Sequence, residues 1–151
     1  MSVYTVSFGH NAMLNVLMKA REDQLDVIPE GFNNSIRWNA GHVLVITDAV
    51  LSLDNTYKSV VPESYKEYFM KGTSPREWEG EPPSVEEISE FITKQLKTIQ
   101  ETFVGREDEE LERPFELLGA SFTKVKDILG FICFHTGMHF NITLNYLRIV
   151  K

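Results

Sequence analysis

Two histidines near the end of the chain have a spacing suited to metal binding. His135 and His139 are four residues apart in a segment whose apolar residues recur with helical period, from Ser121 to Val150. At about 100° per residue, their side chains fall about 40° apart on the apolar face of that helix. A helical pair of histidines at this spacing can offer two nitrogen ligands to one ion. The pattern therefore predicts a helix that carries two candidate metal ligands towards the core.

A third histidine has a similar setting earlier in the chain. Ser35 is a good N-cap for a helix from Ile36 to about Ser52, and His42 lies on its buried stripe one turn beyond Trp38. His42 is the natural third ligand. Three imidazoles suit zinc, nickel, copper or iron, and leave at least one coordination position open, which is typical of a catalytic metal site. A water bound there could act as a nucleophile, or a thiol could bind as thiolate.

The histidine pattern also permits other interpretations. Each histidine could be a core residue that hydrogen-bonds to a neighbouring carbonyl or hydroxyl group. As a second alternative, the trio belongs to a non-catalytic metal-binding or stress-associated interaction module, and as a third, the whole chain is a purely structural bundle. If the site takes a small-molecule substrate, we expect a mostly apolar pocket. Its candidate lining residues, all near the histidine arcs, are Trp38, Asn39, Phe131, Thr143 and Tyr146.

The other elements must bring these side chains together. Apolar spacing predicts a first helix from Phe8 to about Val27. His10 lies at its start and is expected to be a surface or helix-end residue. Ser84 and Glu87 form a capping box that predicts the start of a third long helix. Prolines and glycines break the stretch 54–83, which is a long crossover with a short helix at 64–70. Residues 114–119 read as an irregular or extended connection. We expect a single all-α domain over residues 1–151, a four-helix bundle.

Composition narrows the function classes. The net charge of −7 and the pI near 5.1 argue against nucleic-acid binding, which normally shows a basic patch. No apolar run reaches the roughly 18 residues of a membrane span, and no signal-peptide pattern opens the sequence. The one cysteine, Cys133, suggests a reducing compartment, so we expect a cytoplasmic location. Cys133 lies about 160° round the helix from His135 and is interpreted as an apolar filler.

Two motifs and a linker resemble those of a known family. The stretches Trp38-Asn-Ala-Gly-His42 and Phe134-His135-Thr-Gly-Met-His139, with the linker Phe69 to Gly80 between them, resemble the DinB-like superfamily over nearly the whole chain. That group includes YfiT-like metal-dependent hydrolases and bacillithiol S-transferases.

The resemblance implies an up-down-down-up four-helix bundle, with the long crossover between helices two and three. It also implies a homodimer, and a divalent metal ion (zinc, nickel or iron) held by His42, His135 and His139. The implied activity is thiol S-transfer with a low-molecular-weight thiol such as bacillithiol, or hydrolysis. The chain departs from the family at Thr136, where many members have glutamate, and at Asn141, where the following Gly-Gln pair is broken.

Overall fold

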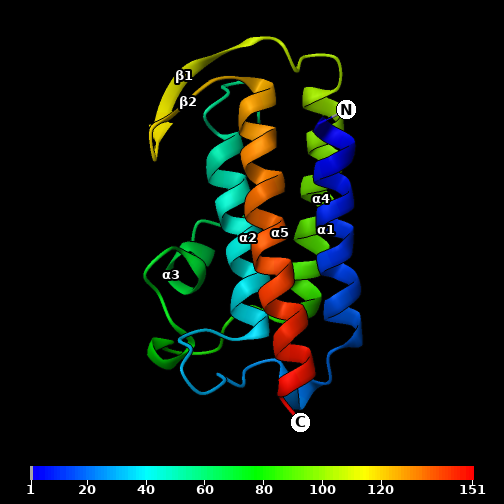
Figure 1. The fold of residues 1–151 in the computed structure, drawn as a ribbon, viewed down its shortest axis with the longest axis vertical. Helices are drawn as coiled ribbons and strands as arrows, with labels where there is room; N and C mark the ends of the chain where they lie inside the picture. The colour runs from blue at the N-terminus through cyan, green and yellow to red at the C-terminus, as the bar shows by residue number, and fades with distance from the viewer. Residues whose placement is uncertain (1) are drawn as a thin grey trace.

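Four long helices lie side by side in the computed structural model, which describes residues 2–151 (Figure 1). They are α1 (Ser2–Lys19), α2 (Ile36–Leu51), α4 (Val85–Phe103) and α5 (Val125–Ile149). Helix α5 packs against α1 and α2, and α4 packs against the same two helices. In Figure 1, α1 and α5 run downwards while α2 and α4 run upwards. The prediction of a mainly helical fold is confirmed.

The helix starts follow the capping residues. The Ser35 side chain accepts a hydrogen bond from the Trp38 amide at the start of α2, and Ser84 and Glu87 form the predicted capping box of α4. The crossover between α2 and α4 contains the short helix α3 (Tyr65–Phe69) and a 3-10 turn, η2 (Pro75–Glu77). Because α3 packs against α2, the crossover lies close to His42.

A two-stranded sheet corrects the all-α prediction. Strands β1 (Glu110–Leu117) and β2 (Ala120–Lys124) pair antiparallel, with Phe115 opposite Phe122. Leu118 and Gly119 both have positive φ, 52° and 80°, as the two central residues of a type I′ hairpin turn require. Residues 114–119, expected to be an irregular or extended connection, are therefore the end of β1 and the turn of the hairpin. The last helix begins at Val125 because Ser121 and its neighbours pair with β1.

The first helix also differs from its predicted bounds of Phe8 to Val27. It begins at Ser2 because Val3 and Val6 are buried in the core, and it ends at Lys19, before the 3-10 turn η1 (Glu22–Gln24). His10 therefore lies in the middle of α1 and is fully buried, so its prediction as a surface or helix-end residue is wrong. Its Nδ1–H donates to the Val6 carbonyl at 3.0 Å, and its Nε2 lies 3.4 Å from the Thr47 hydroxyl.

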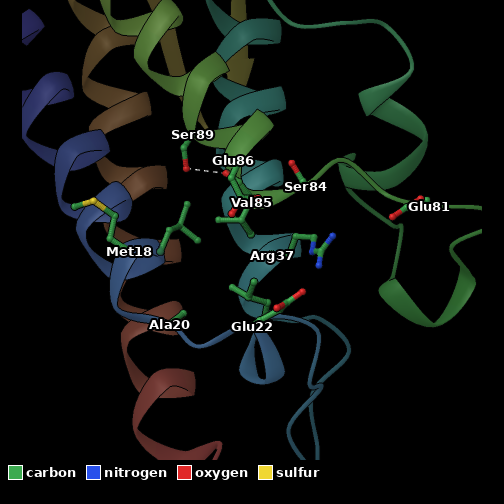
Figure 2. Close-up of a pocket in the computed structure, with 11 residues that line it drawn as sticks. Met18, Ala20, Glu22, Arg37, Glu81, Ser84, Val85, Glu86 and Ser89 are labelled. Atoms are coloured by element: carbon green, nitrogen blue, oxygen red, sulfur yellow. Dashed lines mark hydrogen bonds between the residues drawn. The ribbon is translucent and has the colours of Figure 1, made fainter.

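A cavity of about 600 Å³ lies towards the lower end of the bundle in Figure 1, and Figure 2 shows the residues that line it. It lies between the end of α1 and the starts of α2 and α4, and Arg37 and Glu81 line it with Met18 and Ser89. Arg37 forms an ion pair of 2.8 Å with Asp26 beside it. Neither the three candidate ligands nor the five candidate pocket residues line this cavity.

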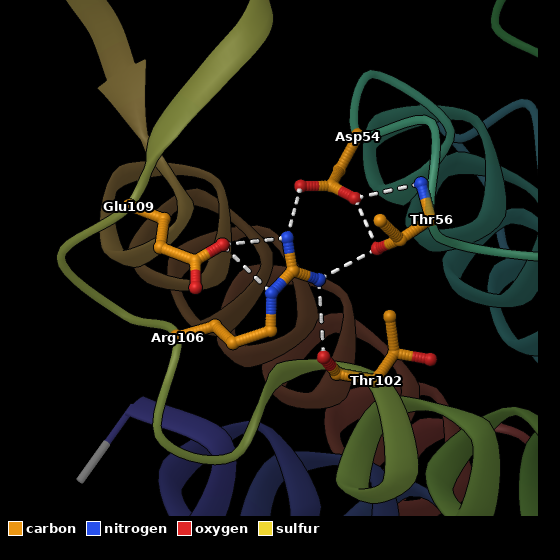
Figure 3. Close-up of polar contacts among 5 residues, drawn as sticks. All are labelled: Asp54, Thr56, Thr102, Arg106 and Glu109. Atoms are coloured by element: carbon orange, nitrogen blue, oxygen red, sulfur yellow. Dashed lines mark hydrogen bonds and ion pairs between the residues drawn. The ribbon is translucent and has the colours of Figure 1, made fainter.

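At the opposite ends of α2 and α4, Arg106 joins two connecting segments (Figure 3). Its guanidinium pairs with the buried Asp54 carboxylate at 3.2 Å and with Glu109 at 2.8 Å, and it also donates to the Thr56 hydroxyl at 2.6 Å. Asp54 accepts from the amide and hydroxyl of Thr56 as well. This cluster ties the segment that follows α2 to the segment that leads into β1.

Candidate metal site

The three predicted ligands converge. His42 comes from α2, and His135 and His139 come from successive turns of α5. One ring nitrogen of each histidine lies within 4.8 Å of a ring nitrogen of the other two, and the ring centroids are 4.5 to 5.1 Å apart. All three rings are buried, with 5 to 8% of each residue exposed. The cluster could hold a metal ion.

Hydrogen bonds fix which nitrogen is free on two of the rings. His42 Nδ1 lies 2.6 Å from the Phe69 carbonyl oxygen, which can only accept, so Nδ1 carries the proton. His139 Nδ1 lies 2.7 Å from Asn39 Oδ1 and donates to it in the same way. Both histidines therefore present an unprotonated Nε2. Protein oxygens that hold the second ring nitrogen in this way are typical of metal-binding histidines.

The Asn39 amide is itself held in one orientation. Its Nδ2 donates to Asn34 Oδ1 and to the Ser35 carbonyl, both at 2.8 Å, which leaves Oδ1 facing His139. Asn34 Oδ1 also accepts from the Tyr146 hydroxyl at 2.9 Å. A polar chain thus runs from Tyr146 through Asn34 and Asn39 to His139. Of the candidate pocket residues, Asn39 contacts a predicted ligand by a hydrogen bond and Tyr146 lies two links further out.

Gly41 allows the crossover to approach His42. A Cβ at this position would lie 2.4 Å from the Phe69 ring, a separation that side chains do not tolerate. The glycine therefore lets α3 lie directly on α2, which places the Phe69 carbonyl at His42. Sequence reasoning missed Phe69 and Asn34 as contacts of the site. A backbone carbonyl has no signature in the sequence, and nothing in the sequence marks Asn34, just before the N-cap of α2, as a contact of the site.

His135 has the least support from hydrogen bonds. Its Nδ1 is buried and has no hydrogen-bond partner among residues 2–151. An unsatisfied buried polar atom of this kind costs roughly 1 to 3 kcal/mol. The His135 ring stacks on the Phe131 ring, with centroids 5.8 Å apart. Phe131 in turn contacts the stacked pair Phe115 and Phe122 of the hairpin. The hairpin therefore supports the His135 ring through Phe131, although no hydrogen bond at Nδ1 from residues 2–151 holds that ring.

Burial keeps all three imidazoles neutral near pH 7. Desolvation lowers the pKa of His42 against the opposing effect of its bond to Phe69. Burial, followed by the charges of His139 and His42, lowers the pKa of His135 to about 3. Burial and then the His42 charge lower the pKa of His139 to about 4. A neutral imidazole is the form that binds a metal ion, so protons compete weakly for this site.

The remaining candidate pocket residues differ in how they contact the three histidines. Trp38 stacks on His42 with ring centroids 4.5 Å apart, and its Nε1–H donates to the Thr73 hydroxyl at 2.9 Å. Thr143 is buried and donates to the His139 carbonyl of its own helix at 2.8 Å. Trp38 and Phe131 are thus the aromatic rings closest to the ligands.

The two positions that depart from the family have different surroundings. Thr136 is buried against α1, where a Cβ on Gly9 would lie 3.3 Å from its methyl group, and Asn141 is exposed. Cys133 is half-buried, and burial raises the pKa of its thiol. In the part of the chain that the structure describes, the only ligand-type side chains that cluster for a metal ion are the three histidines, so Cys133 lies outside the cluster.

None of the helices in residues 2–151 combines the length and apolar character that a membrane span requires. A comparison with curated proteins finds no match to the chain. The model of the DinB superfamily matches residues 7–142, a stretch that includes His42, His135 and His139. This match over most of the chain agrees with the geometry of the three histidines, and the chain belongs to the DinB superfamily.

Proposed function

We propose that this protein is a metal-dependent enzyme of the DinB type, with an up-down-down-up four-helix bundle that holds a divalent ion on His42, His135 and His139. The observation that carries the proposal is the convergence of the three ring nitrogens. Their donor set suits zinc, nickel or iron. The unpartnered Nδ1 of His135 supports it further, because an ion bound at that nitrogen would satisfy a buried polar atom that has no hydrogen-bond partner among residues 2–151.

The proposed reaction is the transfer of a low-molecular-weight thiol of the bacillithiol type, or a hydrolysis. A divalent ion supplies Lewis acidity that lowers the pKa of a thiol or water entering the site. The protein's own groups would hold the imidazoles neutral, orient His42 and His139, and exclude bulk water from the three rings. Trp38 and Phe131 would provide apolar surface for a small-molecule substrate.

Thiol transfer has more support than hydrolysis. Hydrolysis commonly needs a general base beside the attacking water. At position 136 this chain has threonine, which has no basic group, and its methyl group lies against Gly9 on α1. Thiol activation needs no such base, because a thiol ionises far more readily than water.

The test combines metal analysis with an activity assay. Protein purified without chelator is expected to contain about one equivalent of a first-row divalent metal, and to conjugate bacillithiol to an electrophile such as monochlorobimane until a chelator is added. His42→Ala and His139→Ala should lose both properties. His10→Gln is the matched control, because His10 is a buried histidine outside the trio, and it should keep the metal.

A second candidate function rests on the same threonine. If Thr136 reflects the loss of catalysis, the protein is a metal-binding or stress-associated interaction module that retains the ion. This candidate predicts full metal content without turnover across a panel of thiols and hydrolase substrates. Wild-type protein that contains no metal, together with a His135→Ala variant whose stability changes only modestly, would contradict both functions and indicate a structural bundle.

A further inference from the structure

One asparagine oxygen joins the two helices that carry the metal ligands. Asn34 lies just before Ser35, the N-cap of α2. Its Oδ1 accepts hydrogen bonds from Asn39 Nδ2 at 2.8 Å and from the Tyr146 hydroxyl at 2.9 Å. Tyr146 lies in the last turn of α5, two turns beyond His139. Asn34 therefore connects the start of α2, where Asn39 lies, to the end of α5.

The connection is shielded from water. Asn39 is fully buried and Tyr146 is 1% exposed. The Phe32 ring lies edge to face against the Tyr146 ring, with centroids 5.1 Å apart. Burial raises the pKa of the Tyr146 hydroxyl, which therefore keeps its proton and remains a donor near pH 7. Because these hydrogen bonds have little contact with bulk water, they restrain the side chains more strongly than exposed bonds would.

The orientation of the Asn39 amide decides which nitrogen of His139 is free. The two halves of a side-chain amide are nearly alike in shape, so the group can rotate by about 180° and exchange Oδ1 with Nδ2. After such a rotation, Nδ2 would face His139 Nδ1, and the ring proton would move to Nε2. The total charge of the ring would not change. His139 would then present a protonated Nε2, which cannot bind a metal ion.

Three groups resist this rotation. The Ser35 carbonyl and Asn34 Oδ1 both accept from Asn39 Nδ2, and neither has a hydrogen to donate to an oxygen in its place. Asn34 could hydrogen-bond to a rotated Asn39 only by rotating its own amide. That second rotation would remove the acceptor of the buried Tyr146 hydroxyl proton, which costs free energy. The Tyr146 bond therefore fixes Asn34, and Asn34 helps to fix Asn39.

We propose that Asn34 and Tyr146 are positioning residues of the metal site. By holding the Asn39 amide in one orientation, they keep the Nε2 of His139 free to bind the ion. This role rests on the proposed function, because it matters only when His139 binds an ion. Tyr146 thereby has a different role from the pocket lining expected from its place on the helix. Its hydroxyl contacts Asn34 and acts on His139 through Asn39.

The first test is a zinc titration of metal-stripped protein against a chromophoric chelator. Asn34→Ala should weaken zinc binding by about 3- to 10-fold, less than the roughly 10- to 100-fold typical of a residue that contacts a ligand directly. Tyr146→Phe should weaken it by a smaller factor. Asn34→Asp retains an acceptor for both donors and should stay within about twofold of wild type. Asn33→Ala, at an exposed neighbouring asparagine, is the matched control and should also leave the affinity unchanged.

The second test measures the tautomer of His139 directly. In metal-free wild-type protein, nitrogen NMR of the imidazoles should show His139 with its proton on Nδ1. Asn34→Ala should raise the share of the form protonated on Nε2, and Asn34→Asp should restore the wild-type pattern. A purely structural tie between α2 and α5 would give a different result. It would lower the stability of Asn34→Ala in urea and change neither the tautomer nor the zinc affinity.

A double-mutant cycle identifies the route of the effect. Because Asn34 acts through Asn39, Asn34→Ala should have no further effect on zinc affinity in a protein that already carries Asn39→Ala. Additive losses, an unchanged affinity in Asn34→Ala, or a wild-type His139 protonated on Nε2 would each overturn the proposal. Failure of the proposed function has a different sign, which is wild-type protein that binds no zinc. The tautomer of His139 still tests the role of Asn34 in that case.

Discussion

Replacing Asn39 by alanine is expected to weaken metal binding without unfolding the protein. Asn39 Oδ1 accepts the His139 Nδ1 proton at 2.7 Å, in a location where both residues are buried. When Nε2 binds a metal ion, the ring proton must stay on Nδ1. In the variant, metal binding would therefore require a buried donor without a partner, which costs roughly 1 to 3 kcal/mol. At 25 °C this corresponds to a loss of affinity of about 5- to 160-fold, which brackets the 10- to 100-fold typical of such supporting contacts.

The assay is a zinc titration against a chromophoric chelator at pH 7.5, on protein first stripped of metal. Asn145→Ala is the matched control, since Asn145 is exposed on α5. The change at Asn39 should lower affinity, and the control should stay within about twofold of wild type. Equal affinities for Asn39→Ala and wild type would refute the reasoning, because the 2.7 Å contact would then have no part in orienting His139. A parallel urea titration of the metal-free proteins separates affinity from stability.

Three further changes test the parts of the structure that position the site. Gly41→Ala places a Cβ 2.4 Å from the Phe69 ring, so we expect urea unfolding to show a loss of about 1 to 3 kcal/mol and zinc titration a weaker site. Burial lowers the pKa of His10 to about 4, below about 6.5 in an unfolded chain. The unfolded chain therefore binds more protons between these pH values, and stability falls as the pH drops from 6.5 towards 4. At pH 5 the loss from His10 is roughly 2 kcal/mol, and His10→Gln should flatten the pH dependence of urea unfolding in metal-free protein by that amount. Arg106→Ala leaves the buried Asp54 carboxylate without its cation, so the thermal midpoint should fall by several degrees, whereas Arg106→Lys should restore part of it.

Local sequence patterns predicted the structure correctly where a residue type has one common structural role. Ser35, and Ser84 with Glu87, cap the helices that their sequences predict, because a side-chain oxygen beside free amide groups serves the same purpose in any fold. The same patterns failed at the first helix. Val3 and Val6 are buried in the core, so packing extends the helix back to Ser2 and carries His10 into the interior. Val3 and Val6 continue the helical spacing of Met13 and Leu17, which the predicted bounds do not include.

The hairpin shows the same dependence on packing. Residues 110–124 are too short and too irregular in pattern to predict strands, and Pro114 argues against them. The strands nevertheless form, because Phe115 and Phe122 stack on each other and both contact Phe131 of α5 edge to face. Side chains that lie far from strand β1 in the sequence therefore stabilise it.

The sequence by itself determined the helical class and the three histidines, because helical period and residue type are local properties that a chain displays without folding. Only the tertiary structure decided how these histidines are held. The Phe69 carbonyl, the Asn39 amide and the space left by Gly41 act across contacts between helices, and the sequence does not encode the partner of such a contact at any fixed spacing. The free Nε2 of His42 and of His139 is therefore a consequence of packing.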